Sequence, residues 1–569
     1  MKKQLSMLAI LVGASLNAQA AQIPFFTIVD VSDKAYASGI STDDNSLIGL
    51  NVDSDATDTN NTAEYFSTVQ FADFLVDRFR FTLNGYGRES CILSSAVCGS
   101  FWDTTKNFAY QWRQDFLLGI DQRQNVGAET TNETNGFVVA MGADSSTYVG
   151  YKASPNAVNG TPNSRTAFAV LSSNPASQIT LEGTYKVNGV NVLSSANGIK
   201  RIDGHILVTG TAATGKNKGV GTDDYNRCYR SDAGENDFIY CPGLDTQASF
   251  WMLNDAGNVV GLMQASDYGR GDNSVVQTAA ALDVAKYSNT VYGVGYSSTG
   301  EVGDNFLSGR NLASYWNLDL NAKTISSTRI IPLPDGEPGK DDAKLQHSWA
   351  VAVNDNGYVI GNQRYRINKG QNRPVEMFLF NLSKPGTAAS LPLQDKPISG
   401  AGSEAAAINE HNMVVGWRDS RHQTQPVVNG TNRMQEAFLL NAAAPANSWY
   451  LNDLICGKDD AGNKQCAQNG KYYHIAYASG ISSDGTIAAT AYRYDSESDL
   501  NKRANATVVA VKLTPAVANY DGNTPDKYVV KNAPVNNQTG QDGGEGGGGS
   551  LFWLTLLALP FAWLRRYQR

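Results

Sequence analysis

One short pattern recurs along most of this chain and constrains its fold more than any other feature. In its clearest copy, Val351 to Gly361, an apolar run is followed by Asn-Asp-Asn-Gly and then by a second apolar run that closes on glycine. Asn, Asp and Gly accept the positive φ of a tight turn, so each copy predicts a β-hairpin. Other clear copies begin at Ala37, Phe250, Ala406 and Ala478, and weaker ones span Ala196–Val208 and Ala281–Gly293.

Several copies are followed by a further apolar run, which returns once per repeat. It occurs at Met377–Leu382, Glu436–Leu440 and Ala506–Lys512, and it predicts a third strand of the same unit. Three to four strands per unit, with a period of roughly 55 to 85 residues, favour propeller blades over a thin solenoid. We therefore predict an all-β, β-propeller-like repeat assembly of about seven blades (six to eight), with loop insertions, and we expect one of these insertions at residues 85–130.

The composition agrees with a β-rich exported protein. Charged residues make up only 18% of the chain, whereas glycine (54), tyrosine (26) and phenylalanine (20) are abundant. The net charge is −8, and it becomes −13 once the basic residues of the two terminal segments described below are removed. An acidic body repels a phosphate backbone, so the charge excludes nucleic acid as an expected partner.

The first 20 residues predict a secretory signal peptide. Met1-Lys-Lys forms a positive start, an apolar core begins at Met7, and Ala18-Gln-Ala20 supplies a small-x-small cleavage site after Ala20. The chain is therefore expected to cross the inner membrane, which places the folded body (residues 21–520) in an oxidising compartment.

The other end of the chain has three parts in a fixed order. Residues 521–550 form a polar and then glycine-rich linker, and residues 551–569 form a short hydrophobic helix with a basic end. The apolar run Leu551–Leu564 would be about 21 Å long as a helix, which is short of the ~30 Å hydrocarbon core, and Pro560 interrupts it. The terminal arginines are expected to stay cytoplasmic, so that the body faces the periplasm.

This tail resembles the GlyGly-CTERM sorting signal of Gram-negative bacteria. The resemblance implies cleavage by a sorting protease of the rhomboid type in the stretch that includes Gly546 and Gly549, followed by display at the cell surface or secretion. The alternative is a plain membrane anchor, in which case the C-terminal segment is the protein's one membrane contact.

The repeat also resembles a known pattern. Ala-x-x-Ile-Asn-x-x-Gly-x-Val-Val-Gly is similar to the HAF repeats of bacterial extracellular proteins, although Ala167-Phe168 and Ala437-Phe438 lack the preceding histidine. With both terminal segments, the whole chain resembles an uncharacterised family of exported Gram-negative proteins, a domain of unknown function. That resemblance implies no catalytic residues.

Six cysteines fall into three close pairs, and none has C-x-x-C metal-ligand spacing. An even count in an exported chain favours disulfides between sequence neighbours, each worth roughly 2–3 kcal/mol, although 15 connectivities are open and free buried thiols are the alternative. The expected pairs are Cys91 with Cys98, Cys228 with Cys241, and Cys456 with Cys466.

The chain has no strong catalytic signature. Gly210–Lys216 imitates the start of a phosphate-binding loop, but Asn217 stands where Mg²⁺ binding needs Ser or Thr, so we expect a glycine-rich loop between strands. The five histidines lack two-ligand spacing, and no Gly-x-Ser-x-Gly occurs. The tripeptide Arg270-Gly-Asp272 is interpreted as turn chemistry.

Two acidic stretches are candidate calcium sites, because they carry oxygen ligands at alternate positions. Neither has a full ligand pattern, and solvated acidic loops are the simpler interpretation. The candidates are Asp53, Asp55 and Asp58 in the first stretch, and Asp495 and Asp499 in the second.

Four tryptophans fall in or beside repeat strands, where core packing is the expected role and ligand stacking the alternative. They are Trp251, Trp316, Trp349 and Trp417. We predict a surface-associated or secreted protein that binds an extracellular glycan or protein, without chemistry or a cofactor other than the candidate Ca²⁺. The alternatives are an extracellular hydrolase with its site in the propeller channel, and a purely structural protein.

Overall fold

The computed structural model describes the two ends of the body and most of the strands between them. The described residues are 21–51, 65–68, 137–153, 157–158, 161–162, 165–187, 190–191, 194–216, 244–269, 279–299, 310–334, 345–365, 375–393, 402–421 and 435–531. The predicted signal peptide, the insertion at 85–130 and the C-terminal tail from residue 532 lie outside them.

Within this part the chain is almost entirely β-structure. Seven sheets have three or more strands: four sheets of four, one of five and two of three. The described residues contain one short α-helix, α7 (Glu497–Lys502), and two 3-10 turns, η1 (Leu451–Asp453) and η2 (Thr524–Tyr528). The all-β prediction is confirmed.

We number the sheets 1 to 7 along the chain. Sheet 1 contains β2 (Ala35–Ile40), β3 (Leu47–Asn51) and β4 (Tyr65–Thr68). Sheet 2 contains β5 (Phe137–Met141), β6 (Tyr148–Ala153), β9 (Arg165–Leu171) and β10 (Asn174–Leu181). Sheet 3 contains β13 (Ser194–Ile202), β14 (His205–Lys216), β15 (Leu244–Leu253) and β16 (Val259–Gln264).

Sheet 4 contains β17 (Ala279–Tyr287), β18 (Thr290–Thr299), β19 (Arg310–Asp319), β20 (Thr324–Ile325) and β21 (Arg329–Ile330). Sheet 5 contains β22 (Leu345–Val353), β23 (Tyr358–Tyr365) and β24 (Val375–Asn381). Sheet 6 contains β25 (Ser403–Ile408), β26 (Met413–Asp419), β27 (Gln435–Asn441) and β28 (Ser448–Tyr450).

Sheet 7 joins the two ends of the body. It contains β31 (Tyr472–Ile481), β32 (Ile487–Tyr494), β33 (Thr507–Pro515) and, as its outermost strand, the N-terminal β1 (Phe26–Asp33). Three two-stranded pairs lie outside the sheets: β7 (Ala157–Val158) with β8 (Thr161–Pro162), β11 (Lys186–Val187) with β12 (Val190–Asn191), and β29 (Gly457–Lys458) with β30 (Lys464–Gln465).

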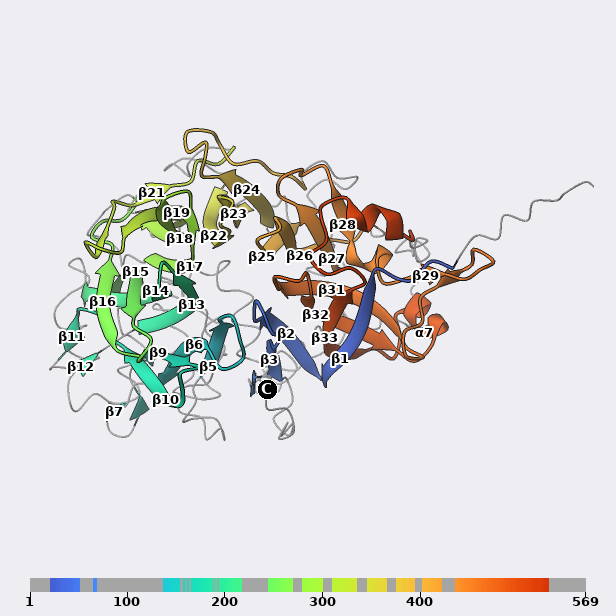
Figure 1. Cartoon of the computed structure of the whole chain (residues 1–569), viewed down its shortest axis with the longest axis horizontal. Helices are drawn as coiled ribbons and strands as arrows, with labels where there is room; N and C mark the ends of the chain where they lie inside the picture. Colours follow the sequence, from blue (N-terminus) through green and yellow to red (C-terminus); the bar gives the residue numbers. More distant parts are fainter. Residues whose placement is uncertain are drawn as a thin grey trace, which may run out of the picture.

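The sheets follow one another around a common centre in chain order (Figure 1). Each first strand contacts the first strand of the next sheet: β2 contacts β5, and the series continues through β13, β17, β22 and β25 to β31. Because β31 also contacts β2, the contacts form a complete cycle. An apolar cluster fills each interface, as where Phe250 of sheet 3 meets Trp316 of sheet 4 at a ring distance of 6.2 Å.

A β-bulge recurs at one position of the first strand in all seven sheets. In sheet 6 the register shifts between Ala405 and Ala407, so that Ala406 is the extra residue. The glycine that closes the repeat, Gly416, pairs with Ala405, and a Cβ there would lie 2.0 Å from the Glu404 carbonyl oxygen. The glycine therefore accompanies the bulge, because the strand next to it leaves no room for a side chain at Gly416. The same shift occurs at Ala37/Gly39, Val138/Ala140, Ala196/Gly198, Ala281/Asp283, Ala350/Ala352 and Ala478/Gly480.

One expectation about loops was wrong. Gly210–Lys216 is not a loop but part of β14, in the middle of sheet 3. Its first glycine serves packing, because a Cβ on Gly210 would lie 2.1 Å from the Ser195 carbonyl oxygen and 2.8 Å from the Trp251 ring.

The folded body also continues past the predicted boundary at residue 520. Residues 521–531 pack against sheets 6 and 7: Val530 is buried and donates its N–H to Asp453, and Trp449 donates its indole N–H to Asp526 at 2.7 Å. The ring of Tyr528 lies 5.1 Å from that of Phe25. A polar composition concealed these few apolar anchors, so the start of the predicted linker moves to about residue 532.

Candidate functional site

The two ends of the sheets differ in how their strands are connected. The first and second strands of every sheet are joined by a short turn, as between β25 and β26. Where neighbouring strands are antiparallel, the connection from the second to the third strand leaves at the opposite end. We call these the turn end and the loop end. Sheet 1 differs, because β4 pairs with β3 in parallel. Three connections outside the described residues, 217–243, 366–374 and 422–434, join second to third strands of antiparallel sheets and attach at the loop end.

Hydrogen bonds tie the turns of neighbouring sheets together. Thr42 donates its N–H to Gly142 of sheet 2 and accepts from Ser483 of sheet 7 through its carbonyl. Asn45 donates to the Asp484 carboxylate at 2.9 Å. Because these turn residues are hydrogen-bonded to neighbouring turns, we interpret the turn end as a scaffold that holds the sheets together.

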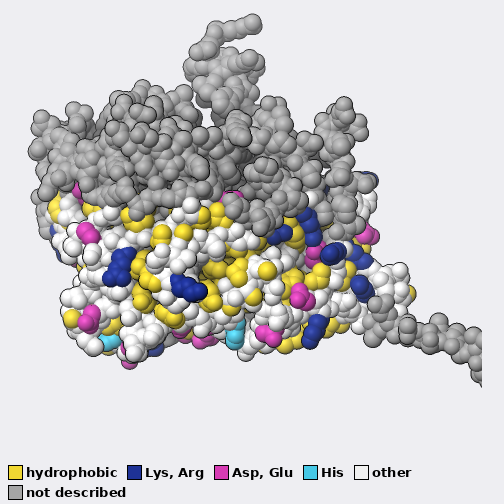
Figure 2. Space-filling view, turned by 90° about the horizontal axis from the view of Figure 1, so that it is seen from above, with side chains coloured by type: hydrophobic (Ala, Val, Ile, Leu, Met, Phe, Trp, Pro, Cys, Tyr) yellow, Lys and Arg dark blue, Asp and Glu magenta, His cyan; other side chains and the backbone are white. Residues whose placement is uncertain are grey.

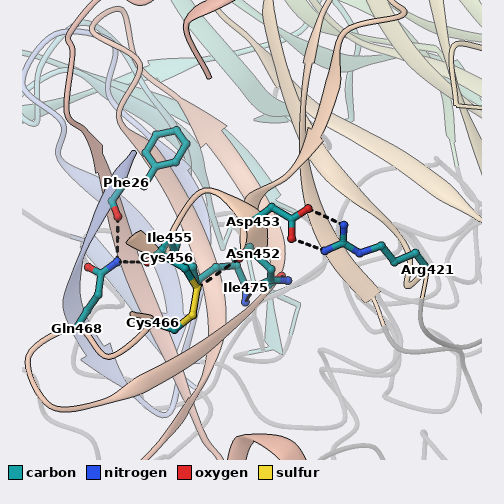
Figure 3. Close-up of a disulfide and its surroundings, with 9 residues drawn as sticks. All are labelled: Phe26, Arg421, Asn452, Asp453, Ile455, Cys456, Cys466, Gln468 and Ile475. Atoms are coloured by element: carbon teal, nitrogen blue, oxygen red, sulfur yellow. Dashed lines mark hydrogen bonds and ion pairs between the residues drawn. A yellow bond between two sulfur atoms is a disulfide. The ribbon is translucent and has the colours of Figure 1, made fainter. Parts of the chain in front are cut away.

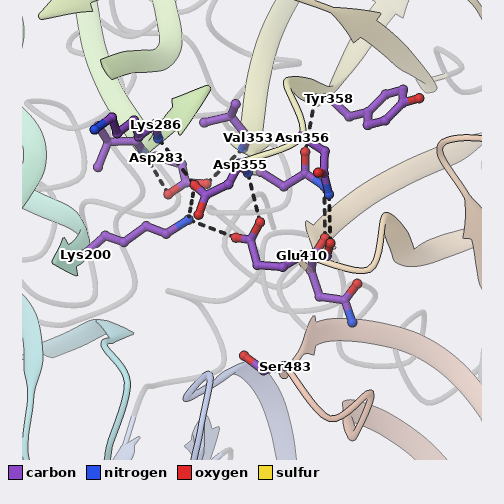
Figure 4. Close-up of polar contacts among 12 residues, drawn as sticks. Lys200, Asp283, Lys286, Val353, Asp355, Asn356, Tyr358, Glu410 and Ser483 are labelled. Carbon is purple, nitrogen blue, oxygen red and sulfur yellow. Dashed lines mark hydrogen bonds and ion pairs between the residues drawn. The ribbon is translucent and has the colours of Figure 1, made fainter. Parts of the chain in front are cut away.

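A charged cluster at the turn end lies near the centre of the molecule (Figure 4). Lys200 extends from sheet 3 so that its Nζ lies 3.1 Å from Glu410 of sheet 6 and 3.5 Å from Asp355 of sheet 5. Asp283 of sheet 4 accepts from the N–H groups of Val284 and Val353 at 2.8 and 2.9 Å. One lysine thus connects four sheets.

The electrostatics of this cluster depend on how many carboxylates share one lysine. Burial raises the pKa of Asp283 to about 6, although Lys200 and the two N–H donors act in the opposite direction. Burial acts to lower the pKa of Lys200, but Asp283, Glu410 and Asp355 outweigh it, and the net shift is upward.

Lys200 and Asp283 both depart from the repeat. Lys200 stands where the other copies have small or uncharged residues: Ser41, Gly142, Ala285, Asn354, Asn409 and Ser482. Asp283 stands where the others have Gly39, Ala140, Gly198, Ala352, Ala407 and Gly480. The two exceptions occur in neighbouring sheets and interact, so we assign this cluster to holding the centre together at the turn end.

A second charged cluster lies at the loop end of sheet 6 (Figure 3). Arg421, just after β26, donates two hydrogen bonds of 2.6 Å to the Asp453 carboxylate of η1, which is 6% exposed. Its guanidinium is also 3.8 Å from Glu436, which is 2% exposed. Burial opposes the charge of Arg421, but these carboxylates raise its pKa overall.

Both arginines of this cluster lie over the aromatic ring of Tyr450. The guanidinium of Arg418 lies 3.5 Å from the Tyr450 ring centroid, and that of Arg421 lies 4.0 Å from it. Burial raises the pKa of Tyr450 and lowers that of Arg418. Arg418 makes no ion pair within the described part of the chain, and its Nε is buried without an acceptor. We call Arg418, Arg421, Tyr450, Glu436 and Asp453 the arginine cluster.

The cluster is fixed from behind by the disulfide Cys456–Cys466, one of the three predicted pairs, with a Cα–Cα distance of 4.3 Å. Gln468 donates to the carbonyl oxygens of Phe26 and Ile455 and accepts from the Ile28 N–H, which joins this segment to β1. The other predicted cysteines, Cys91, Cys98, Cys228 and Cys241, lie outside the described residues.

The predicted acidic sites are only partly described. Asp495 pairs with Lys471 at 2.7 Å, and the Asp499 carboxylate at the start of α7 accepts from the Ser496 hydroxyl and the Asn505 amide. No group of three acidic, histidine or cysteine side chains that could hold a metal ion is found among the described residues. Asp53, Asp55 and Asp58 lie outside them, as do the predicted cleavage sites at Ala20, Gly546 and Gly549 and the tripeptide Arg270–Asp272, so calcium binding stays a prediction.

The tryptophan prediction is confirmed for three of the four positions. Trp251, Trp316 and Trp349 are 1%, 0% and 5% exposed and belong to the core. Trp417 is half-buried and donates its indole N–H to Glu404 at 3.1 Å. Within the described part of the chain, no helix has the length and apolarity to cross a membrane.

Sequence reasoning missed both charged clusters. A full alignment of the repeats would have revealed Lys200 and Asp283, because each replaces a small or neutral residue. Arg418 and Arg421 follow the repeat rather than lie within it, and their partners Tyr450 and Asp453 come from a separate connection. No local pattern therefore marks them.

Comparison with known proteins gives a family but no activity. The family described as "Protein of unknown function (DUF3466)" matches residues 2–567. No curated protein matches the chain. Among solved structures, a protein of unknown function from Dyadobacter fermentans DSM 18053 is 9% identical, with 62% of this chain and 84% of that chain covered and a TM-score of 0.31.

Two further structures are enzymes. The Cellvibrio cellulosa alpha-L-arabinanase is 12% identical over 58% of this chain and 93% of its own, with a TM-score of 0.24. The Trypanosoma rangeli sialidase, in complex with sialic acid, is 11% identical over 60% of this chain and 57% of its own, with a TM-score of 0.22. Similarity at this level carries no inference about activity.

Proposed function

The chain belongs to the DUF3466 family of proteins of unknown function, and we propose that it is an exported binding protein, built as a seven-bladed β-propeller, that holds its ligand at the loop end. Each of the seven sheets is one blade in this proposal. The single observation that carries the function is the contrast between the two ends of the blades.

The cycle of contacts supports the closed seven-bladed ring. First strands touch in sequence from sheet 1 to sheet 7 and back to sheet 1. The N-terminal β1 pairs with the C-terminal β33 from Phe26↔Pro515 to Asp33↔Val509. A strand donated from the N-terminal end of the chain to the last blade joins the two ends of the ring by main-chain hydrogen bonds.

The distribution of side-chain partners supports the loop end as the binding face. At the turn end, turn residues bond to the next turn, and Lys200 with its carboxylates holds the centre. The varied connections between second and third strands attach at the loop end, except in sheet 1, whose β3 and β4 are parallel. Ligand-binding residues are concentrated on such connections when a rigid scaffold positions them. The arginine cluster, in which the buried Nε of Arg418 has no acceptor, lies at the same end.

We base the proposed location of this protein on the two terminal segments of its sequence. The signal peptide exports the body, and the C-terminal segment delivers it to the surface or the medium after cleavage, or else anchors it. Nucleic acid is not among the proposed partners. In Figure 2, a view of one side of the molecule, basic and acidic side chains are interspersed on the described surface, without a basic field that would suit a phosphate backbone.

The proposal is tested by blocking one end at a time. A polyethylene glycol chain is attached to a cysteine introduced at Lys502, exposed at the loop end, or at Ala322, exposed in the turn between β19 and β20. Residues 21–531 are then titrated calorimetrically with neutral and carboxylate-bearing oligosaccharides. We expect the loop-end adduct alone to abolish binding. Loss of binding only with the turn-end adduct, or hydrolysis of the oligosaccharides, would refute the proposal.

A further inference from the structure

We propose that Arg418 is the anchor of a binding site for a carboxylate group, of the kind carried by an acidic oligosaccharide. This inference deepens the proposed function and rests on it, because the site lies at the loop end. It goes further by naming the residue that makes contact and the chemical group that it recognises.

The two arginines of the cluster share a tyrosine but differ in their charge partners. Arg421 has Asp453 at 2.6 Å and Glu436 at 3.8 Å. Arg418 is stacked closer to Tyr450, yet no salt bridge of Arg418 exists in the described part of the chain, and its buried Nε has no acceptor. A buried donor left unpaired is costly, and such groups are uncommon in folded proteins unless they serve a purpose.

Glu436 is the obvious candidate to neutralise Arg418, since the two residues are cross-strand partners between β26 and β27. Its oxygens are already used. One accepts from the Ser420 hydroxyl at 2.8 Å and the Arg421 N–H at 3.2 Å, and the other accepts from Asn452 at 3.4 Å. The carboxylate is therefore committed to Arg421 and its neighbours.

The local charge balance is positive in a protein whose overall balance is negative. Arg503, after α7, interacts electrostatically with Glu436, so three guanidinium groups face the two carboxylates Glu436 and Asp453. Burial also lowers the pKa of Arg503. The chain as a whole has a net charge of −8, so this local excess of positive charge is opposite in sign to the net charge of the molecule. An anionic ligand would balance it.

The geometry of Arg418 selects the chemistry of the ligand. One face of the guanidinium lies against the Tyr450 ring at 3.5 Å and the Tyr450 side chain also accepts a hydrogen bond from it, while the buried Nε has no acceptor and is left for an in-plane partner. A planar carboxylate accepts two such bonds side by side, and charge-assisted pairs of this kind are the strongest hydrogen bonds in proteins. Stacking also fixes the side chain before the ligand arrives, which lowers the entropic cost of binding.

The decisive experiment compares Arg418→Met with Arg418→Lys in residues 21–531. Trigalacturonate is the probe, and the neutral trigalactose and inorganic phosphate are the comparison ligands, all measured by isothermal titration calorimetry. We expect binding of trigalacturonate but not of trigalactose. Binding should weaken about ten- to a hundredfold in Arg418→Met, with a smaller loss in Arg418→Lys, which keeps the charge without the fork.

Thermal unfolding of the ligand-free variants separates a binding role from a structural one. Removing a guanidinium whose buried Nε has no acceptor should leave the melting temperature of Arg418→Met unchanged or raise it, whereas a structural role would lower it. Equal binding of trigalacturonate by parent and Arg418→Met would overturn the inference, as would phosphate binding as tightly as trigalacturonate. If the loop-end adduct still blocked another ligand, the proposed function would stand while this inference failed.

Discussion

Replacing Arg421 by methionine tests whether the arginine cluster is built as its contacts indicate. The substitution keeps the length of the aliphatic side chain and removes the guanidinium. Two buried carboxylates then lose their cation: Asp453 loses two hydrogen bonds of 2.6 Å, and Glu436 loses an ion pair of 3.8 Å. The expected result is a large loss of stability, the opposite of the effect expected for Arg418→Met.

The size of the loss follows from burial. Breaking a buried ion pair by removing one partner costs about 3–5 kcal/mol, and the lost contact with the Tyr450 ring adds about 0.5–1 kcal/mol. The Arg421 side chain is 19% exposed, so water can enter the gap and solvate Asp453 in part. We therefore expect a decrease of about 3 kcal/mol in the free energy of unfolding at pH 7.

Urea unfolding followed by tryptophan fluorescence measures this decrease, with Arg201→Met as the matched control. Arg201 pairs with Asp255 at 2.7 Å, but the two side chains are 57% and 75% exposed, and the control should change stability by less than about 1 kcal/mol. The double variant Arg421→Met/Asp453→Asn should recover much of the loss, because the amide leaves no buried charge at that position. A loss no larger than that of Arg201→Met, or no recovery in the double variant, would refute this account of the cluster.

Three further predictions concern the scaffold. Gly416→Ala should cost about 2–4 kcal/mol, because its Cβ would lie 2.0 Å from the Glu404 carbonyl oxygen, whereas Gly386→Ala, with no atom within 4 Å, should be nearly neutral in thermal unfolding. Replacing both Cys456 and Cys466 by serine should cost about 2–3 kcal/mol in urea unfolding, while an unchanged midpoint would show that the bridge does not stabilise the body. The pKa of Asp283 is raised to about 6 from the ordinary 3.8, so its contribution to stability is full below about pH 4 and is lost as the pH rises through 6. Asp283→Ala should flatten the pH profile of stability over that window by about 1–3 kcal/mol. An unchanged profile would contradict the assignment.

Much of the fold could be predicted from the sequence, because its signals are local. The alternation of apolar residues, the Asn, Asp and Gly of the turns and the returning Ala-Phe runs specify hairpins and a third strand wherever they occur. The all-β class, the repeat and the Cys456–Cys466 pair could therefore be predicted from the sequence. The local signals missed the bulge that explains the repeat's glycine, since the carbonyl group of Glu404 that excludes a side chain at Gly416 lies on a neighbouring strand.

The clusters could not be predicted, because their members come from distant parts of the chain. Lys200 meets Glu410 only when the sheets surround a common centre, and the hydrogen bonds of Glu436 to Ser420 and Arg421 depend on how the folded chain places these residues. The pairing of Phe26 with Pro515 is likewise decided by the tertiary structure. The sequence alone determined the repeating β unit and the expected route of export, since both depend on short-range patterns. The tertiary structure decided which polar groups lie together and which are left without a partner at each end of the sheets, because their members come from distant parts of the chain.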